Sequence, residues 1–374
     1  MTTLMSDQNV ARRILEHIEN GTTDLGDDVW HEPVANYRSA DRWAAEVDLL
    51  RRLPIAFCPS AALAEPESYI AREAAGTPII VVRGQDGAVR AFRNACRHRG
   101  MQVATGAGCS KAFVCRYHGW TYRLDGTLSH IPHEHGFPDL DKATHGLVPL
   151  KAVERSGLVF VAQDGDIDHG GALDPLPDMI APQQKIFATT ESDTAANWKI
   201  VAEGFLEGYH IRSTHRDTFY PYGFDNLNVI ERFGRNSRVT FPFRRIEKLA
   251  QVPPESRRVD GLLTYVYHLF PNVMIAVLSQ HTKVVILEPV SIDRTRLITF
   301  ALANAGSSAG EQQEAVARDA AFVDQTGAAE DREVTCAIQR GIGSDANQVF
   351  TFGRFEAAIG HFHRSLGAAL AKAP

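Results

Sequence analysis

Two short cysteine and histidine segments lie close together in the first third of the sequence. Cys96 and His98 belong to CRHRG, and Cys115 and His118 belong to CRYHGW. The spacing lets one tight loop direct each pair to one point, and a hairpin can bring the two loops together. Two thiolates and two imidazoles suit either a tetrahedral zinc ion or a two-iron, two-sulfide cluster with cysteines on one iron and histidines on the other. Each segment carries one ligand of each kind, which favours the cluster.

A second group of metal-ligand side chains lies in the segment GFLEGYHIRSTH. If this segment is helical, Glu207 and His210 share a face, and His215 folds back from the helix end. Taken alone, the segment also fits surface histidines paired with glutamate. Two histidines and one carboxylate on one side of a ferrous ion leave its other positions open for dioxygen and substrate. The segment therefore predicts two ligands of a mononuclear iron centre.

The third ligand is predicted to be Asp331, in the segment AAEDREVTCAIQRG. Asp331 lies three residues before Val334 and seven before Ile338, so a helix would place it on the same side as this apolar face. A carboxylate on a buried face is costly unless it is paired or binds a cation. Iron ligation explains such a position, whereas the neighbouring Glu330 is expected to be solvated.

The order of elements predicts an α+β protein with three parts. Residues 1–52 form a helical N-terminal segment, and residues 53–165 show short strands and turn pairs typical of an antiparallel hairpin domain. A stretch rich in Gly, Asp and Pro at 164–182 predicts a linker. Residues 166–374 then form a second domain, with a helix-like opening, several strands, and helices at about 311–340 and 354–371.

These segments resemble those of the terminal oxygenase alpha subunits of Rieske non-haem iron oxygenases. CRHRG and CRYHGW resemble the two halves of the Rieske cluster motif, while NWKIVAEGFLEGYHIRSTH and EDREVTCAIQRGI resemble catalytic-domain segments. The resemblance implies a Rieske-type 2Fe-2S cluster bound by Cys96, His98, Cys115 and His118. It implies a mononuclear Fe(II) bound by His210, His215 and Asp331, with Glu207 as the acid that bridges to the cluster of a neighbouring subunit.

The resemblance also implies a fold and an activity. The fold is an antiparallel β Rieske domain followed by a helix-grip (START-like) catalytic domain with an antiparallel sheet and C-terminal helices. The activity is that of a terminal oxygenase, a ring-hydroxylating mono- or dioxygenase that uses O2 to hydroxylate a small organic substrate. Electrons would pass from His118 through Glu207 and His210 to the iron.

The substrate is expected to be an aromatic or other small cyclic compound, since several aromatic side chains could line a pocket for an arene, although the same side chains also fit an ordinary core. These are Phe205, Phe219, Tyr220, Tyr222, Phe224 and Tyr267. The alternative is an N- or O-demethylating monooxygenase, because Glu rather than Asp at the bridging position is seen among monooxygenating and demethylating relatives, and aromatic side chains also cage quaternary ammonium groups. Two further classes are a Rieske-type electron carrier, which needs only the first motif, and a zinc-stabilised binding protein.

Composition excludes several other classes. The formal net charge is −6 and the basic residues are scattered, so nucleic acid is not an expected partner. No apolar stretch has the length of a signal peptide or membrane span, and five cysteines do not suggest a disulfide framework, so a cytoplasmic location is expected.

The source of electrons lies outside the chain. The sequence has no strand-to-helix dinucleotide fingerprint and no plant-ferredoxin run of cysteines. Electrons from NAD(P)H must therefore arrive through a separate reductase, with or without a ferredoxin. The resemblance implies a homotrimer, or a hexamer with a small beta subunit.

Overall fold

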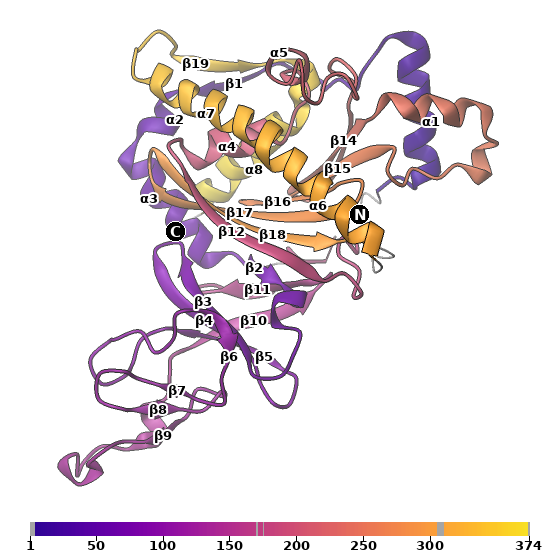
Figure 1. The fold of residues 1–374 in the computed structure, drawn as a ribbon. Coiled ribbons are helices and arrows are strands. Elements are labelled where there is room, and N and C mark those ends of the chain that lie inside the picture. The colour runs from indigo at the N-terminus through magenta and orange to yellow at the C-terminus, as the bar shows by residue number, and fades with distance from the viewer. Residues whose placement is uncertain (1–3, 170, 175, 305–309, 373–374) are drawn as a thin grey trace. The chain divides into compact units, whose positions relative to one another are not determined.

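The computed structural model describes residues 4–169, 171–174, 176–304 and 310–372 (Figure 1). The chain divides into two compact units. The smaller unit is Val47–Pro182, and the larger unit combines Met1–Glu46 with Gln183–Pro374. The N-terminal segment therefore packs with the C-terminal half of the chain.

The smaller unit is built from two antiparallel sheets. The first has seven strands in the order β2-β11-β10-β5-β4-β3-β6, and the second has three in the order β7-β8-β9. The strands are β2 (Ile55–Pro59), β3 (Ser68–Ala74), β4 (Thr77–Arg83), β5 (Val89–Arg93), β6 (Gly106–Cys109), β7 (Phe113–Val114), β8 (Thr121–Tyr122), β9 (Leu128–His130), β10 (Pro149–Arg155) and β11 (Leu158–Ala162). A core of β-branched and aromatic side chains, including Ile80, Phe92 and Trp120, fills this unit.

The larger unit contains a seven-stranded antiparallel sheet in the order β12-β18-β17-β16-β15-β14-β13, and β1 pairs with β19 in a separate ribbon. The strands are β1 (Trp30–Pro33), β12 (Ile186–Thr194), β13 (Val229–Phe233), β14 (Asn236–Pro242), β15 (Leu263–Leu269), β16 (Val273–Val277), β17 (His281–Ser291), β18 (Arg294–Ala303) and β19 (Val349–Phe352). Buried runs such as Val284–Leu287 on β17 explain why this sheet forms.

Helices flank these sheets. The α-helices are α1 (Asp7–Asn20), α2 (Ala35–Arg38), α3 (Ala40–Arg52), α4 (Trp198–Gly204), α5 (Ile211–Thr214), α6 (Gly310–Phe322), α7 (Ala328–Ile342) and α8 (Ala357–Ala371). The 3-10 helices are η1 (Ser60–Leu63), η2 (Glu134–Gly136), η3 (Lys142–Thr144), η4 (Arg244–Gln251), η5 (Pro254–Ser256) and η7 (Arg354–Glu356). The element η6 (Val323–Gly327) is a π-helix. None of the helices within the described ranges is long and apolar enough to cross a membrane.

The helices of the larger unit pack on its sheet. Helix α4 contacts β17, β18 and α7, α6 contacts β17, and α8 contacts β13 and β14. Figure 1 shows α6 and α7, in orange, following one another across the unit. Antiparallel sheets with helices at the C-terminal end confirm the predicted α+β class.

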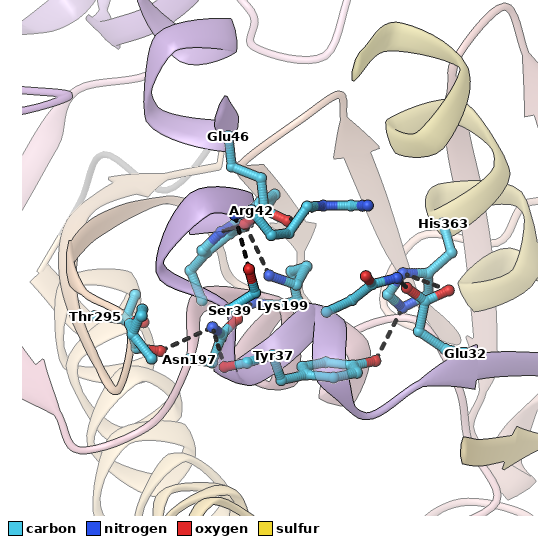
Figure 2. A network of polar contacts seen from close by, with 12 residues as sticks. Glu32, Tyr37, Ser39, Arg42, Glu46, Asn197, Lys199, Thr295 and His363 are labelled. Carbon is cyan, nitrogen blue, oxygen red and sulfur yellow. Dashed lines mark hydrogen bonds and ion pairs between the residues drawn. The ribbon is translucent and has the colours of Figure 1, made fainter. Parts of the chain in front are cut away.

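A buried polar network ties the N-terminal segment to α4 (Figure 2). Nζ of Lys199 lies 2.7 Å from Oε2 of Glu46, and both side chains are 0% exposed. Nε1 of Trp198 donates to the same carboxylate at 2.9 Å, and Arg42 pairs with its other oxygen at 2.8 Å. Since a buried ion pair needs further hydrogen bonds to offset desolvation, the network fixes α3 against α4.

The helix pattern differs from the sequence prediction in two places. Helix α4 ends at Gly204 and α5 begins at Ile211, so Glu207 and His210 lie in a turn rather than on one helix face. The predicted helix at about 311–340 is interrupted by the five-residue π-helix Val323–Gly327. A π-helix has i→i+5 hydrogen bonds and locally shifts the phase of the helix, which a search for a regular 3.6-residue period does not detect.

Candidate metal centres

The two cysteine and histidine segments form two loops with the same hydrogen bonds. The amide of Gly100 donates to the carbonyl of Cys96 at 2.8 Å, and the amide of Gly119 donates to the carbonyl of Cys115 at 2.9 Å. In each loop the cysteine amide donates to the carbonyl five residues later, at 2.8 Å. Both glycines have positive φ, of 80° and 74°, a conformation that other residues rarely adopt. The sequence thus builds the same tight loop twice.

The loops separate the thiols from the imidazoles. Cys96 and Cys115 are each 3% exposed, while His98 and His118 lie nearer the surface with their Nδ1 atoms 3.1 Å apart. A tetrahedral zinc ion would draw all four donor atoms to within about 4 Å of one another. Within the described ranges, these four residues do not form such a single-ion group. The separation of two thiols from two imidazoles fits a two-iron cluster and does not fit one zinc ion.

Aromatic side chains support these loops. The hydroxyl of Tyr122 lies 3.2 Å from Sγ of Cys96 and accepts a hydrogen bond from the amide of Arg97 at 2.9 Å. The ring of His98 stacks on Trp120 with ring centres 4.9 Å apart. Burial raises the pKa of Cys96 in the absence of a bound metal. These contacts support both loops from the side of the core.

The second group of predicted residues converges from three separate elements. His210 lies in the turn after α4, His215 follows α5, and Asp331 lies in the first turn of α7. Oδ1 of Asp331 is 3.0 Å from Nε2 of His215 and 3.5 Å from Nε2 of His210. One ligand atom from each residue lies within 4.8 Å of the others. Two imidazoles and a carboxylate in this arrangement suit one divalent transition metal with open positions.

The Nδ1 atoms of His210 and His215, which are not the atoms nearest Asp331, each contact a carboxylate. Oε1 of Glu207 makes a short contact with Nδ1 of His210. Oε2 of Glu330 lies 2.7 Å from Nδ1 of His215 and accepts from the hydroxyl of Thr218 at 2.7 Å. The expectation that Glu330 is solvated is therefore wrong. The signal that sequence reasoning missed is its position beside Asp331, which allows both carboxylates of α7 to contact one imidazole.

The electrostatics of the site favour a cation. Burial by itself lowers the pKa of His210 and of His215, but contacts with Glu207 and Asp331 respectively outweigh it, so both pKa values are raised. For Glu330, burial raises the pKa while hydrogen bonds from His215 and Thr218 lower it, and the net shift is downward. These carboxylates stabilise positive charge on the two imidazoles.

The apolar face used to locate Asp331 is not buried in this chain. Val334 and Ile338 are 37% and 39% exposed, and the side chain of Asp331 is 43% exposed. The prediction that Asp331 lies on a buried face is therefore wrong. Asp331 reaches the histidines because α7 packs against α4 and α5.

One of the predicted aromatic side chains adjoins this site. Phe219 lies with its ring centre 4.9 Å from that of His215, and Phe322, which sequence reasoning missed, contacts Phe219 at 5.6 Å. A Cβ at Gly327 of the π-helix would come within 2.1 Å of the Phe219 ring, so only glycine leaves room for it. By contrast, Tyr267 belongs to a separate network on β15, where its hydroxyl accepts from Arg238 at 3.3 Å.

Each of the two units matches a known protein family. A family model described as "Rieske [2Fe-2S] domain" matches residues 54–152, and one described as "Ring hydroxylating alpha subunit (catalytic domain)" matches residues 184–372. The second match covers half of the chain. The chain belongs to the Rieske oxygenase alpha subunits. Its cofactors are accordingly a Rieske [2Fe-2S] cluster and a mononuclear iron, and the donor sets described above fit both groups.

Individual relatives of this Rieske oxygenase chain act on ammonium compounds. It is 30% identical over 234 residues to the carnitine monooxygenase oxygenase subunit of Acinetobacter pittii, covering 58% of this chain and 62% of that protein. It is 38% identical over 157 residues to the glycine betaine monooxygenase oxygenase subunit of Chromohalobacter salexigens, covering 40% and 34%. The match thus spans less than two thirds of each of these relatives.

Solved structures share the whole fold of this alpha subunit. A quaternary ammonium Rieske monooxygenase in complex with L-carnitine superposes with a TM-score of 0.75 at 22% identity, covering 99% of both chains. Naphthalene 1,2-dioxygenase from Rhodococcus sp. superposes equally well, with a TM-score of 0.75 at 19% identity, covering 99% of this chain and 100% of that chain. The fold therefore does not separate ammonium from arene oxidation.

Proposed function

We propose that this chain is the terminal oxygenase of a Rieske system that monooxygenates a small quaternary ammonium compound. The observation that carries the proposal is the convergence of Nε2 of His210 and Nε2 of His215 on Oδ1 of Asp331. A ferrous ion held by these groups would supply dioxygen activation, and the Rieske cluster would supply single electrons. The reaction inserts one oxygen atom into a C–H bond and reduces the other to water with two electrons and two protons.

The residues that bind the cofactors are assigned as follows. Cys96 and Cys115 hold one iron of the cluster and His98 and His118 the other, which is supported by the separation of thiols from imidazoles. His210, His215 and Asp331 hold the mononuclear iron.

Glu207 is assigned as the acid that connects the two centres. Its carboxylate contacts Nδ1 of His210, so it orients the ligand and can accept a hydrogen bond from a second partner. That partner would be His118 of a neighbouring subunit, which makes a homotrimer, or a hexamer with a small beta subunit, the functional assembly. A structural relative whose description reports inter-subunit electron transfer supports this arrangement.

The proposed substrate class is supported by the relatives and by one aromatic side chain. The matched carnitine, glycine betaine and choline monooxygenases act on quaternary ammonium compounds. Phe219 offers an aromatic ring next to His215, and the face of such a ring attracts a quaternary ammonium group. Oxidation of a methyl group on the nitrogen would be N-demethylation.

Hydroxylation of an aromatic ring is the second candidate. It is favoured by a match at 34% identity over 169 residues to the chlorobenzene dioxygenase subunit alpha of Cupriavidus sp., covering 40% of this chain and 36% of that protein. Phe219 and Phe322 would then pack against an arene rather than a cation.

Either reaction needs electrons from a separate protein. We infer an NAD(P)H-dependent reductase, with or without a ferredoxin, as the partner, and a cytoplasmic location for the system. None of the five cysteines forms a disulfide, which is compatible with a reducing compartment.

The test combines the purified holoprotein with a Rieske reductase and NADH. Carnitine, glycine betaine, choline, chlorobenzene and naphthalene are supplied separately, and dioxygen uptake is measured together with incorporation of isotope-labelled oxygen into product. We expect coupled oxygen uptake with at least one ammonium compound and none with the arenes. Coupled turnover of an arene alone would establish the second candidate, and turnover of none with both metals bound would contradict the assigned substrate class.

A further inference from the structure

Adjacent residues of α7 contact opposite ends of one imidazole. Oδ1 of Asp331 lies 3.0 Å from Nε2 of His215, and Oε2 of Glu330 lies 2.7 Å from Nδ1 of the same ring. The side chain of His215 is 1% exposed. Contacts at both nitrogens leave this buried ring little freedom to rotate or flip.

Glu330 is itself held in place by a third residue. The hydroxyl of Thr218 donates to Oε2 of Glu330 at 2.7 Å, and the amide of Thr218 donates to the carbonyl of His215 at 3.2 Å. The turn that carries His215 is thus fastened to α7 through Thr218 and Glu330. Besides the contact of Asp331 with His215, this is a second connection between α7 and the turn that carries His215, two segments that are distant in the sequence.

The position of Glu330 is that of a support rather than of a ligand. Its oxygen contacts Nδ1, which points away from the space where both Nε2 atoms meet Asp331. An imidazole that binds a metal through Nε2 carries its proton on Nδ1, and an acceptor at Nδ1 fixes both the tautomer and the direction of the ring. Glu207 has the same relation to His210.

We propose that Glu330 is a positioning residue that holds His215 with Nδ1 protonated and Nε2 directed at the mononuclear metal, and that Thr218 orients Glu330 for this task. The inference rests on the proposed iron site. It predicts a site in which each histidine ligand has its own supporting carboxylate, Glu207 for His210 and Glu330 for His215.

The test measures metal binding rather than turnover. The mononuclear metal is removed from the cluster-loaded protein, and Co²⁺ is titrated while its visible spectrum and the cluster spectrum are recorded. Loss of such a supporting group typically weakens metal binding by about 10- to 100-fold. We expect the Co²⁺ dissociation constant to rise in that range for Glu330→Ala, and less for Glu330→Gln and Thr218→Val, with the cluster spectrum unchanged.

Two controls separate the possible failures. Glu333→Gln changes an exposed glutamate on the same helix and should bind Co²⁺ like the wild type. If all Glu330 and Thr218 variants also bind like the wild type while Asp331→Ala does not, the positioning role is wrong and the iron site stands. If Asp331→Ala binds Co²⁺ normally, the proposed iron site itself is wrong. Should Glu330→Ala fail to fold, Glu330→Gln and Thr218→Val decide the question.

Discussion

Oδ1 of Asp331 lies 3.0 Å from Nε2 of His215, although the two residues belong to different helical segments far apart in the sequence. The contact depends on the packing of α7 against α4 and α5, and it places a carboxylate between two imidazoles. This relationship makes one residue of α7 responsible for completing the proposed metal site, whose two histidines flank α5.

Replacing Asp331 by alanine should therefore empty the mononuclear site alone. We expect Asp331→Ala to lose that iron and more than about 100-fold in activity, since even changes outside the ligand shell cost 10- to 100-fold. The cluster should keep its visible spectrum, because its ligands lie in the other unit. Iron analysis and the visible spectrum of one sample check both points. Retention of the mononuclear iron would remove Asp331 from the ligand set.

Glu207→Gln should separate metal binding from electron transfer. Glutamine keeps an acceptor for His210 but loses the negative charge, so both metals should remain bound. We expect the rate at which a pre-reduced cluster is oxidised, in the presence of substrate and dioxygen, to fall at least about 10-fold. Stopped-flow absorbance measures this rate directly. An unchanged rate would exclude Glu207 from the route between the centres.

The two metal motifs were predictable from the sequence to different degrees. Cys96, His98, Cys115 and His118 lie within two short loops, and their geometry depends mostly on local hydrogen bonds and on Gly100 and Gly119. The spacing of the residues within each short segment is therefore sufficient to predict that these four side chains form one group.

The mononuclear site depends on contacts between distant segments, and part of the reasoning about it was wrong. The sequence pattern predicts Asp331 on a buried helix face, yet Val334 and Ile338 are exposed. The position of Glu330 beside Asp331 is a signal in the sequence, but the contact of Glu330 with His215 also depends on the register of α7 against α5, which the sequence does not reveal. Spacing alone likewise could not reveal that Glu207 and His210 lie in a turn.

The buried ion pair of Lys199 and Glu46 should be important for stability (Figure 2). Lys199→Met leaves the carboxylate of Glu46 buried without its ammonium partner, although Arg42 and Trp198 still contact it. Breaking a buried pair costs about 3 to 5 kcal/mol when the remaining charge is left uncompensated, so with Arg42 still paired we expect a loss near the lower end of this range. Denaturant unfolding measures the loss. The matched control is Arg318→Met, which breaks an exposed pair with Glu314 and should cause no measurable change.

A stability loss for Lys199→Met no larger than that of the control would mean that the buried network does not fix the N-terminal segment. Burial lowers the pKa of Lys199, whereas the negative charge of Glu46 opposes that shift. The double variant Lys199→Met with Glu46→Gln removes both charges and should recover part of the lost free energy of unfolding.

Glu356 should make stability depend on pH. Burial, together with the charges of Glu207 and Glu203, raises its pKa from 4.5 to about 7. The folded state then binds more protons than the unfolded state between these values, so the free energy of unfolding decreases as the pH rises from 4.5 to 7. Glu356→Gln keeps an acceptor for the amide of Gly353, which contacts Glu356 at 2.5 Å, and cannot ionise.

We therefore expect Glu356→Gln to gain thermal stability relative to the wild type as the pH rises through this window. Calorimetric melting temperatures at several pH values give the comparison, with Glu333→Gln as the exposed control. Parallel pH profiles for Glu356→Gln and the wild type would show that folding does not raise the pKa of Glu356.

The central claim is that one chain carries a Rieske cluster and a separate mononuclear iron. The most direct measurement is the iron and acid-labile sulfide content of anaerobically purified protein, with visible and reduced-state paramagnetic spectra of the same sample. About three iron and about two sulfide per chain, with a Rieske spectrum, is the predicted result. Zinc without sulfide would contradict the account from its first motif onward, and about two iron that added Fe²⁺ cannot raise to three would contradict the mononuclear site.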